Sequence, residues 1–129
     1  MKNLIFTVLI AFYFVGAGAS AKLYNEKYYQ NEWCSQWYGK QEVKLFDGTR
    51  VDCVTKNYAV EFDFAKKWAE CFGQTVHYSD LTLKKPACIL IIEKPEDFRH
   101  YCKSKPTFVK HNVTLWYMLA PDFYKNLFK

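Results

Sequence analysis

The hydrophobic and polar positions of the chain follow a helical period at first and an alternating one after it. Tyr29, Trp33 and Trp37 recur at the i, i+4, i+8 spacing of one helical face, within an otherwise polar stretch. Residues 41–46 (QEVKLF) alternate between polar and apolar, as the residues of a half-buried strand do. The Asp-Gly pair at 47–48 is a hairpin turn signal. The pattern therefore predicts an amphipathic helix followed by a β-hairpin.

The helical period returns in the middle of the chain. Residues 63–80 place apolar side chains at helical spacing, which predicts a packed helix. Residues 87–92 (ACILII) are nearly all apolar, which is typical of a central strand covered on both faces. The predicted elements, in chain order, are a helix over 25–37, strands over 41–46, 49–55 and 58–62, a helix from 63, a strand over 87–92, a short helix over 95–102, a strand over 112–119 and a short helix over 121–128. This αβββαβ order, with short C-terminal additions, predicts an α/β (α+β) fold with a central mixed sheet.

The first 21 residues have the pattern of a secretory signal rather than of a folded element. Lys2 precedes an apolar run, and small residues ending at 19–21 (ASA) follow it. A membrane anchor is the alternative interpretation, although the apolar run is short for a membrane span. We therefore expect an exported protein, periplasmic or secreted, in which residues 22–129 form a single domain. Once the signal is removed, we expect no stable membrane association.

Composition and charge narrow the class of protein further. A chain of 129 residues with 24% charged residues is typical of one globular domain, and its composition excludes disorder and collagen-like repeats. The formal net charge is +5, or +4 without Lys2, which permits a polyanionic partner without requiring one. All five cysteines follow residue 21, where an oxidising compartment would allow disulfides. A bridge between Cys34 and Cys53 is plausible, and an odd count leaves at least one thiol free or paired between chains.

Two carboxylates lie in adjacent strands of the predicted meander. Asp52 and Glu61 each interrupt an apolar run, and a buried acid is costly unless it is paired, capped or bound to a cation. Together with Asp63, they would place three oxygen donors near one sheet edge, and Mg²⁺ prefers such ligands. The alternative is structural: the acids would cap a helix and form ion pairs with Arg50 or Lys67.

The helix that follows these acids carries candidate partners for them. Lys67, Cys71 and Gln74 lie at i, i+4 and i+7 and therefore share a helical face. A lysine there would steady a metal-bound hydroxide, and Gln74 would hold a phosphate or a carboxylate. Alternatively, Lys66 and Lys67 are ordinary solvated residues of an amphipathic helix.

The segment 33–78 resembles a small exported branch of the PD-(D/E)XK nuclease superfamily. The resemblance lies in Trp33-Cys34, in DGTRVDC at 47–53 and in AVEFDFAKKWAECFGQ at 59–74. It implies the αβββαβ core of the restriction-endonuclease-like fold, which is the order of elements predicted above.

The resemblance also implies a catalytic site. By it, Asp52 and Glu61 are the residues that bind Mg²⁺ (or Mn²⁺), and Glu32 is the acid that some members carry on the first helix. The family motif places a lysine two residues after the Glu, whereas this chain has Asp63 there. Because some members relocate that lysine to the next helix, the resemblance makes Lys67 the candidate.

Two further positions complete this site. Lys66 is the second candidate for the relocated lysine, and Gln74 matches a glutamine that resolvase-like members carry on the same helix. The implied function is an exported, Mg²⁺-dependent nuclease that hydrolyses DNA phosphodiester bonds.

Two other functions remain open at this stage. The domain would be a catalytically inactive binding module if neither lysine reaches the metal, and the Glu-Phe-Asp sequence at 61–63 favours that alternative. The other is a disulfide-containing structural protein of the cell envelope.

Overall fold

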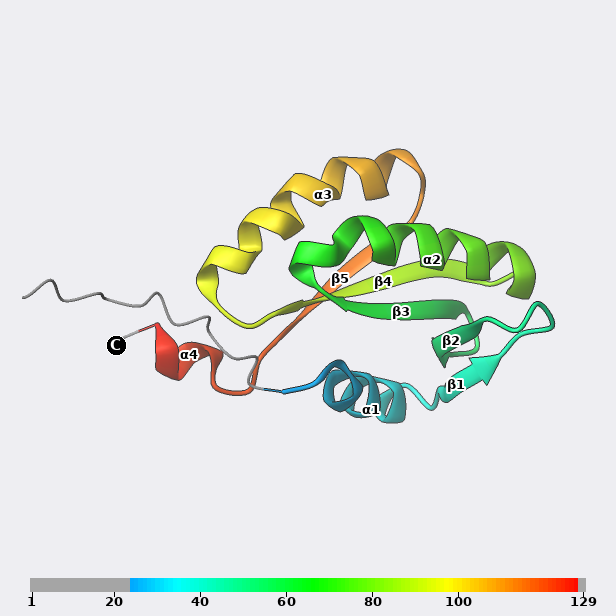
Figure 1. Cartoon of the computed structure of the whole chain (residues 1–129), viewed down its shortest axis with the longest axis horizontal. Helices are drawn as coiled ribbons and strands as arrows, with labels where there is room; N and C mark the ends of the chain where they lie inside the picture. The colour runs from blue at the N-terminus through cyan, green and yellow to red at the C-terminus, as the bar shows by residue number, and fades with distance from the viewer. Residues whose placement is uncertain (1–23, 128–129) are drawn as a thin grey trace, which may run out of the picture.

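A computed structural model describes residues 24–127, and the expected signal at 1–21 lies outside them. The described residues form an α+β domain built on one five-stranded mixed sheet (Figure 1). The elements are α1 (Glu26–Gln36), β1 (Lys40–Lys44), β2 (Arg50–Val54), β3 (Tyr58–Phe64), α2 (Trp68–Thr82), β4 (Lys85–Ile92), α3 (Phe98–Lys110), β5 (Thr114–Leu119) and α4 (Phe123–Asn126). The strands lie in the order β1-β2-β3-β4-β5; β1, β2 and β3 are antiparallel, and β3, β4 and β5 are parallel. The predicted class of fold and the predicted helix-then-meander order are confirmed.

Two predicted boundaries are wrong. The helix predicted from residue 63 begins only at Trp68, after a 3-10 turn, because β3 continues to Phe64 in parallel register with β4. The short helix predicted over 95–102 is the longer α3, and Pro106 lies inside it. A proline inside a helix removes one N–H donor and crowds the carbonyl four residues earlier, and the burial of Ser104 and Phe108 at i, i+4 holds that turn against the sheet.

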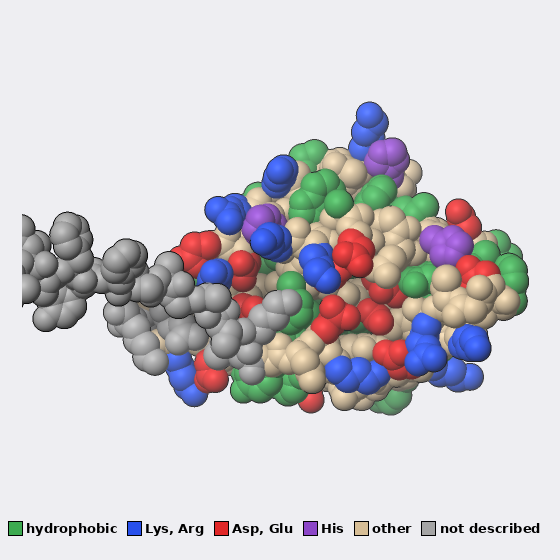
Figure 2. All heavy atoms as spheres, in the orientation of Figure 1, with side chains coloured by type: hydrophobic (Ala, Val, Ile, Leu, Met, Phe, Trp, Pro, Cys, Tyr) green, Lys and Arg blue, Asp and Glu red, His purple; other side chains and the backbone are tan. Residues whose placement is uncertain are grey.

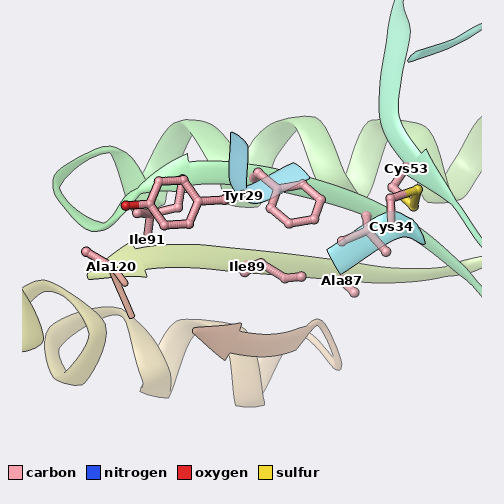
Figure 3. Packing of buried hydrophobic residues seen from close by; sticks show 9 residues of the cluster. Tyr29, Cys34, Cys53, Ala87, Ile89, Ile91 and Ala120 are labelled. Carbon is pink, nitrogen blue, oxygen red and sulfur yellow. A yellow bond between two sulfur atoms is a disulfide. The ribbon is translucent and has the colours of Figure 1, made fainter. Parts of the chain in front are cut away.

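The central strand β4 separates two hydrophobic clusters, as its apolar sequence predicts. Ile89 and Ile91 point toward α1, where they pack with Tyr29 (Figure 3). Cys88 and Leu90 point to the opposite face, which α2 and α3 cover. All four β4 side chains are fully buried. The sheet is therefore fixed between helices on both faces.

Two disulfides tie helices to strands. Cys34–Cys53 joins α1 to β2 and confirms the predicted bridge (Figure 3). Gly39 lies directly against both of its sulfur atoms, so a side chain at this position has no room. Cys71–Cys88 joins α2 to β4, a pairing that the sequence does not indicate.

The remaining cysteine of the described chain, Cys102, is free and exposed. Two bridges in so small a domain are typical of proteins that work in an oxidising compartment. A search of residues 24–127 for a helix both long and apolar enough to cross a membrane finds none.

We expect the Cys34–Cys53 bridge to stabilise the fold strongly. Its cysteines are 19 residues apart, and closing a loop of that size contributes about 3 kcal/mol by constraining the unfolded chain. The double substitution Cys34→Ala with Cys53→Ala should therefore lower the free energy of unfolding, measured by urea denaturation, by about that amount. Cys102→Ser is the matched control and should leave it unchanged. Equal stability of all three proteins would contradict the expectation.

Candidate functional site: an acid pair where two strands part

The two predicted acids meet at the point where β2 and β3 separate. The hydrogen-bonded ladder between these strands reaches Cys53 and Val60 and goes no further. One residue beyond this ladder, the side chains of Asp52 and Glu61 make hydrogen bonds in place of the missing backbone ones. Glu61 Oε1 accepts from the Asp52 N–H at 3.1 Å, and Asp52 Oδ2 accepts from the Phe62 N–H at 2.9 Å. Each carboxyl group thus crosses to the backbone of the other strand.

Burial and the proximity of the two carboxyl groups favour the protonated form of this pair. Burial raises the pKa of Glu61 well above its ordinary range, and the neighbouring Asp52 charge raises it further. The pKa of Asp52 is also raised, mainly by burial. Because the pKa of Glu61 is raised to about 10, the pair holds one proton at neutral pH. Glu61 is buried, while Asp52 is half-buried and connects the pair to the surface.

The first turns of α1 surround Asp52 with polar groups. Gln30 is buried and donates from Nε2 both to the Asp52 carbonyl and to Glu42 Oε1. Lys27 pairs with Glu42 at 2.9 Å, and the Lys27 charge partly offsets the rise in the pKa of Asp52. Arg50 also contacts Glu42, at 3.5 Å. The structural alternative predicted an ion pair between Arg50 and the candidate acids, whereas Arg50 pairs with Glu42.

Among the acids of α1, Glu26 is the one whose charge affects a pKa of the pair. Its charge contributes to the raised pKa of Glu61. Glu32, the residue expected from the resemblance, is exposed, and its charge adds to the burial that raises the pKa of Tyr28. The Cys34–Cys53 bridge explains the difference, because residues at i−4 and i−8 from Cys34 share its helical face and Glu32 does not.

Of the α2 stripe predicted to face the acids, Cys71 contacts the strand that carries Glu61, and Tyr78, which was not predicted, continues the same helical face. Cys71 Sγ lies 3.6 Å from the Glu61 carbonyl oxygen. Tyr78 is buried, and the charges of Glu61 and Asp52 add to the burial that raises the pKa of its hydroxyl. Gln74 is half-buried and lies between Cys71 and Tyr78 on the same stripe of α2.

The remaining predicted residues lie at the edge of this arrangement. Asp63 is buried on the same face of β3 as Glu61, and its Oδ1 accepts from the Phe64 N–H at 2.9 Å. Lys66 and Lys67 are exposed in the 3-10 turn just before α2. Within the part of the chain that the structure describes, neither lysine forms an ion pair with the acids.

The residues that sequence reasoning missed are Glu26, Lys27, Gln30, Glu42 and Tyr78. One signal was present: Glu26, Gln30 and Cys34 recur at four-residue intervals, and Cys34 was a candidate to bridge to the neighbour of Asp52. The position of Tyr78 carried no comparable signal, because it depends on how α2 packs on the sheet.

The donor set suits a hard divalent cation with few protein ligands. Mg²⁺ is commonly held by one or two carboxylates, with water and substrate phosphate completing its octahedral shell. Asp52 and Glu61 supply two such groups once the shared proton has left. Between residues 24 and 127, no group of three or more His, Cys, Asp or Glu side chains is arranged around a metal position. Figure 2 shows acidic side chains gathered on the surface between α1 and α2.

Comparison of the chain with protein-family models, with curated proteins and with solved structures found no match. The function is therefore argued from the geometry of the site.

The shared proton makes a prediction about stability and pH. Because folding raises the pKa of Glu61, the folded chain binds protons that the unfolded chain releases above about pH 4. Stability should therefore fall as pH rises toward the raised pKa. Glu61→Gln keeps the acceptor oxygen and adds a permanent donor, so this variant should exceed the wild type by about 1 kcal/mol or more at pH 8 and match it near pH 5.

Urea unfolding at both pH values measures this difference. Glu32→Gln makes the same chemical change on the exposed face of α1 and serves as the control. A Glu61→Gln protein less stable than the wild type at pH 8 would show that the carboxyl group is ionised and paired.

Proposed function

We propose that the protein is an exported, Mg²⁺-dependent (or Mn²⁺-dependent) nuclease that hydrolyses DNA phosphodiester bonds. The observation that carries the proposal is the meeting of Asp52 and Glu61 between two parting strands. The order α1-β1-β2-β3-α2-β4 supports it, because it is the order implied by the resemblance to the PD-(D/E)XK nucleases. We assign the domain to the restriction-endonuclease-like fold on the same basis.

The acid pair has the chemistry needed to hold the cation. Asp52 and Glu61 would bind it after losing their proton, so metal affinity should rise with pH. When bound, the cation would activate a water molecule and stabilise negative charge on the scissile phosphate. Gln30 holds the backbone of Asp52 in place, which fixes the direction of that carboxylate.

The groups of α2 are assigned to the water and the substrate. Lys67 would orient the attacking water, with Lys66 as the second candidate, and Gln74 would contact the phosphate backbone. Exposed lysine side chains have the length and freedom to reach an incoming phosphate. Glu26 takes the place expected for Glu32, because it is the α1 acid whose charge acts on Glu61.

The charge of the chain suits a polyanionic substrate. Without Lys2 of the expected signal the formal net charge is +4, which favours contacts with the phosphate backbone, and such contacts carry no sequence specificity. Export fits the two disulfides, since a reducing cytosol would keep these thiols apart.

One observation favours the inactive binding module as a second candidate. Asp63 occupies the position of the motif lysine, and Lys67 makes no ion pair with the acids among the described residues. A module of this kind would bind nucleic acid equally well with and without Mg²⁺ and would leave it uncut.

Plasmid nicking tests the proposal directly. The wild type should convert supercoiled plasmid to the open form with Mg²⁺ or Mn²⁺ and should fail in EDTA. Glu61→Gln and Asp52→Asn should each lower the rate by about a hundredfold or more, because each removes a metal ligand without opening a cavity. Asp80→Asn removes an exposed acid of α2 and is the matched control. Cleavage by Glu61→Gln at the wild-type rate would overturn the assignment of the site.

The lysine assignment is tested in the same assay. Lys67→Ala should reduce cleavage more than Lys66→Ala if Lys67 orients the water. Equal, small effects would mean that both side chains are ordinary solvated residues, and the absence of cleavage in the wild type under all conditions would favour the binding module.

A further inference from the structure

A groove of about 670 Å³ lies along β5, the edge strand of the sheet that is remote from the acid pair. Six aromatic side chains from four elements line it, and we call it the aromatic groove: Trp33, Trp37, Tyr58, Tyr101, Trp116 and Tyr117. Three of the four tryptophans in the chain belong to it. The acid pair does not use these residues. Four of them also pack against the hydrophobic clusters (Trp33, Tyr58, Tyr101 and Trp116), whereas Trp37 and Tyr117 are exposed.

Two of the six aromatic rings are exposed to solvent, and the other four are half-buried. Trp37 is 61% exposed and Tyr117 is 47% exposed, values far above those of the core aromatics. Trp33 stacks on Trp37 with ring centroids 5.6 Å apart and also contacts Trp116 at 5.6 Å. The result is a fixed series of flat surfaces on the outside of the molecule, a feature that usually marks a binding site.

One end of the groove is basic. The β2–β3 turn closes it, and Lys56 of that turn is part of the lining. Lys84 donates from Nζ to the Lys56 carbonyl at 2.8 Å, so its amine lies beside the turn. Lys85 is the strand partner of Tyr58, and Lys40 is the strand partner of Val54. Among the described residues that line the groove there is no carboxylate.

We infer that the aromatic groove binds single-stranded nucleic acid. Stacked tryptophans favour planar rings, and each unpaired base has two free faces, whereas the bases of a duplex are already stacked. The lysines around residues 55–57 would contact the phosphates that follow those bases. A neutral sugar or an apolar peptide would make no use of this positive charge.

The groove and the acid pair are connected through one hairpin. Thr55 lies three residues after Asp52, and Tyr58 lies three residues before Glu61, so about 10 Å of strand separates the two sites. Tyr58 and Glu61 are an odd number of residues apart, so their side chains point to opposite faces of β3. A strand held in the groove would therefore have to pass over the β2–β3 turn to reach the acid pair. This last step rests on the proposed nuclease function, while binding itself does not.

Tryptophan fluorescence provides the test. The wild-type chain in EDTA is titrated with an oligothymidylate of about ten nucleotides, a length within the usual range of single-strand sites. We expect saturable quenching, with an affinity that falls steeply as salt is raised. Trp37→Ala should weaken binding by about tenfold, since it removes one stacking surface. Lys56→Gln should reduce the salt dependence by about one phosphate contact.

Two control variants match the test variants. One changes the residue next to Trp37, and the other makes the same chemical change as Lys56→Gln. Tyr38→Ala removes a side chain that is 96% exposed, next to Trp37 but outside the groove, and should bind as the wild type does. Lys44→Gln removes the lysine at the end of β1 opposite to Lys40, and it should leave the salt dependence of binding unchanged. Equal losses for Trp37→Ala and Tyr38→Ala, or no quenching by the oligonucleotide, would overturn the inference. Salt-insensitive self-association that buries the tryptophans would show that a second copy of the chain occupies the groove.

The experiment separates this inference from the nuclease proposal. Glu61→Gln should bind the oligonucleotide as tightly as the wild type in EDTA, whether or not the wild type cleaves DNA. Binding without cleavage would leave the groove assignment standing and the nuclease proposal refuted. Cleavage of plasmid without oligonucleotide binding would support the nuclease proposal and refute the groove assignment.

Discussion

The proton shared by Asp52 and Glu61 is the constraint on which the rest of the site depends. Two ionised carboxylates in so buried a place would repel each other, so the pair is stable only when it holds a positive charge in some form. In the free protein that charge is a proton, and in the proposed active state it is a divalent cation. In the proposed function, the same geometry therefore holds the proton at low pH and the cation at higher pH.

The two disulfides hold the helices on either side of this pair. Cys34–Cys53 fixes α1 beside Asp52, and Cys71–Cys88 fixes α2 beside Glu61, because Cys88 is the strand partner of Glu61 in the parallel ladder. Each acid thus lies next to a covalent link between a strand and a helix. A site of this kind is best preserved where thiols are oxidised, which connects its geometry to the proposed export.

Local patterns predict much of this fold, and long-range packing decides the rest. Alternation and turn signals identify the meander and place Asp52 and Glu61 on neighbouring strands, and the apolar run identifies β4. The Cys71–Cys88 bridge depends on the parallel pairing of β3 with β4, which joins segments far apart in the sequence. Whether Glu26 or Glu32 lies near the acid pair likewise depends on which face of α1 is turned to the sheet. The helical period of the sequence does not determine that face. The roles of Lys67 and Gln74 stay predictions.

The central claim is that the acid pair exchanges its proton for a divalent cation. Anomalous diffraction from crystals soaked in Mn²⁺ at pH 8 tests it most directly. The account predicts a single anomalous peak between the carboxyl groups of Asp52 and Glu61, and none there in crystals of the Glu61→Gln protein. A wild-type map without a peak at that position would contradict it.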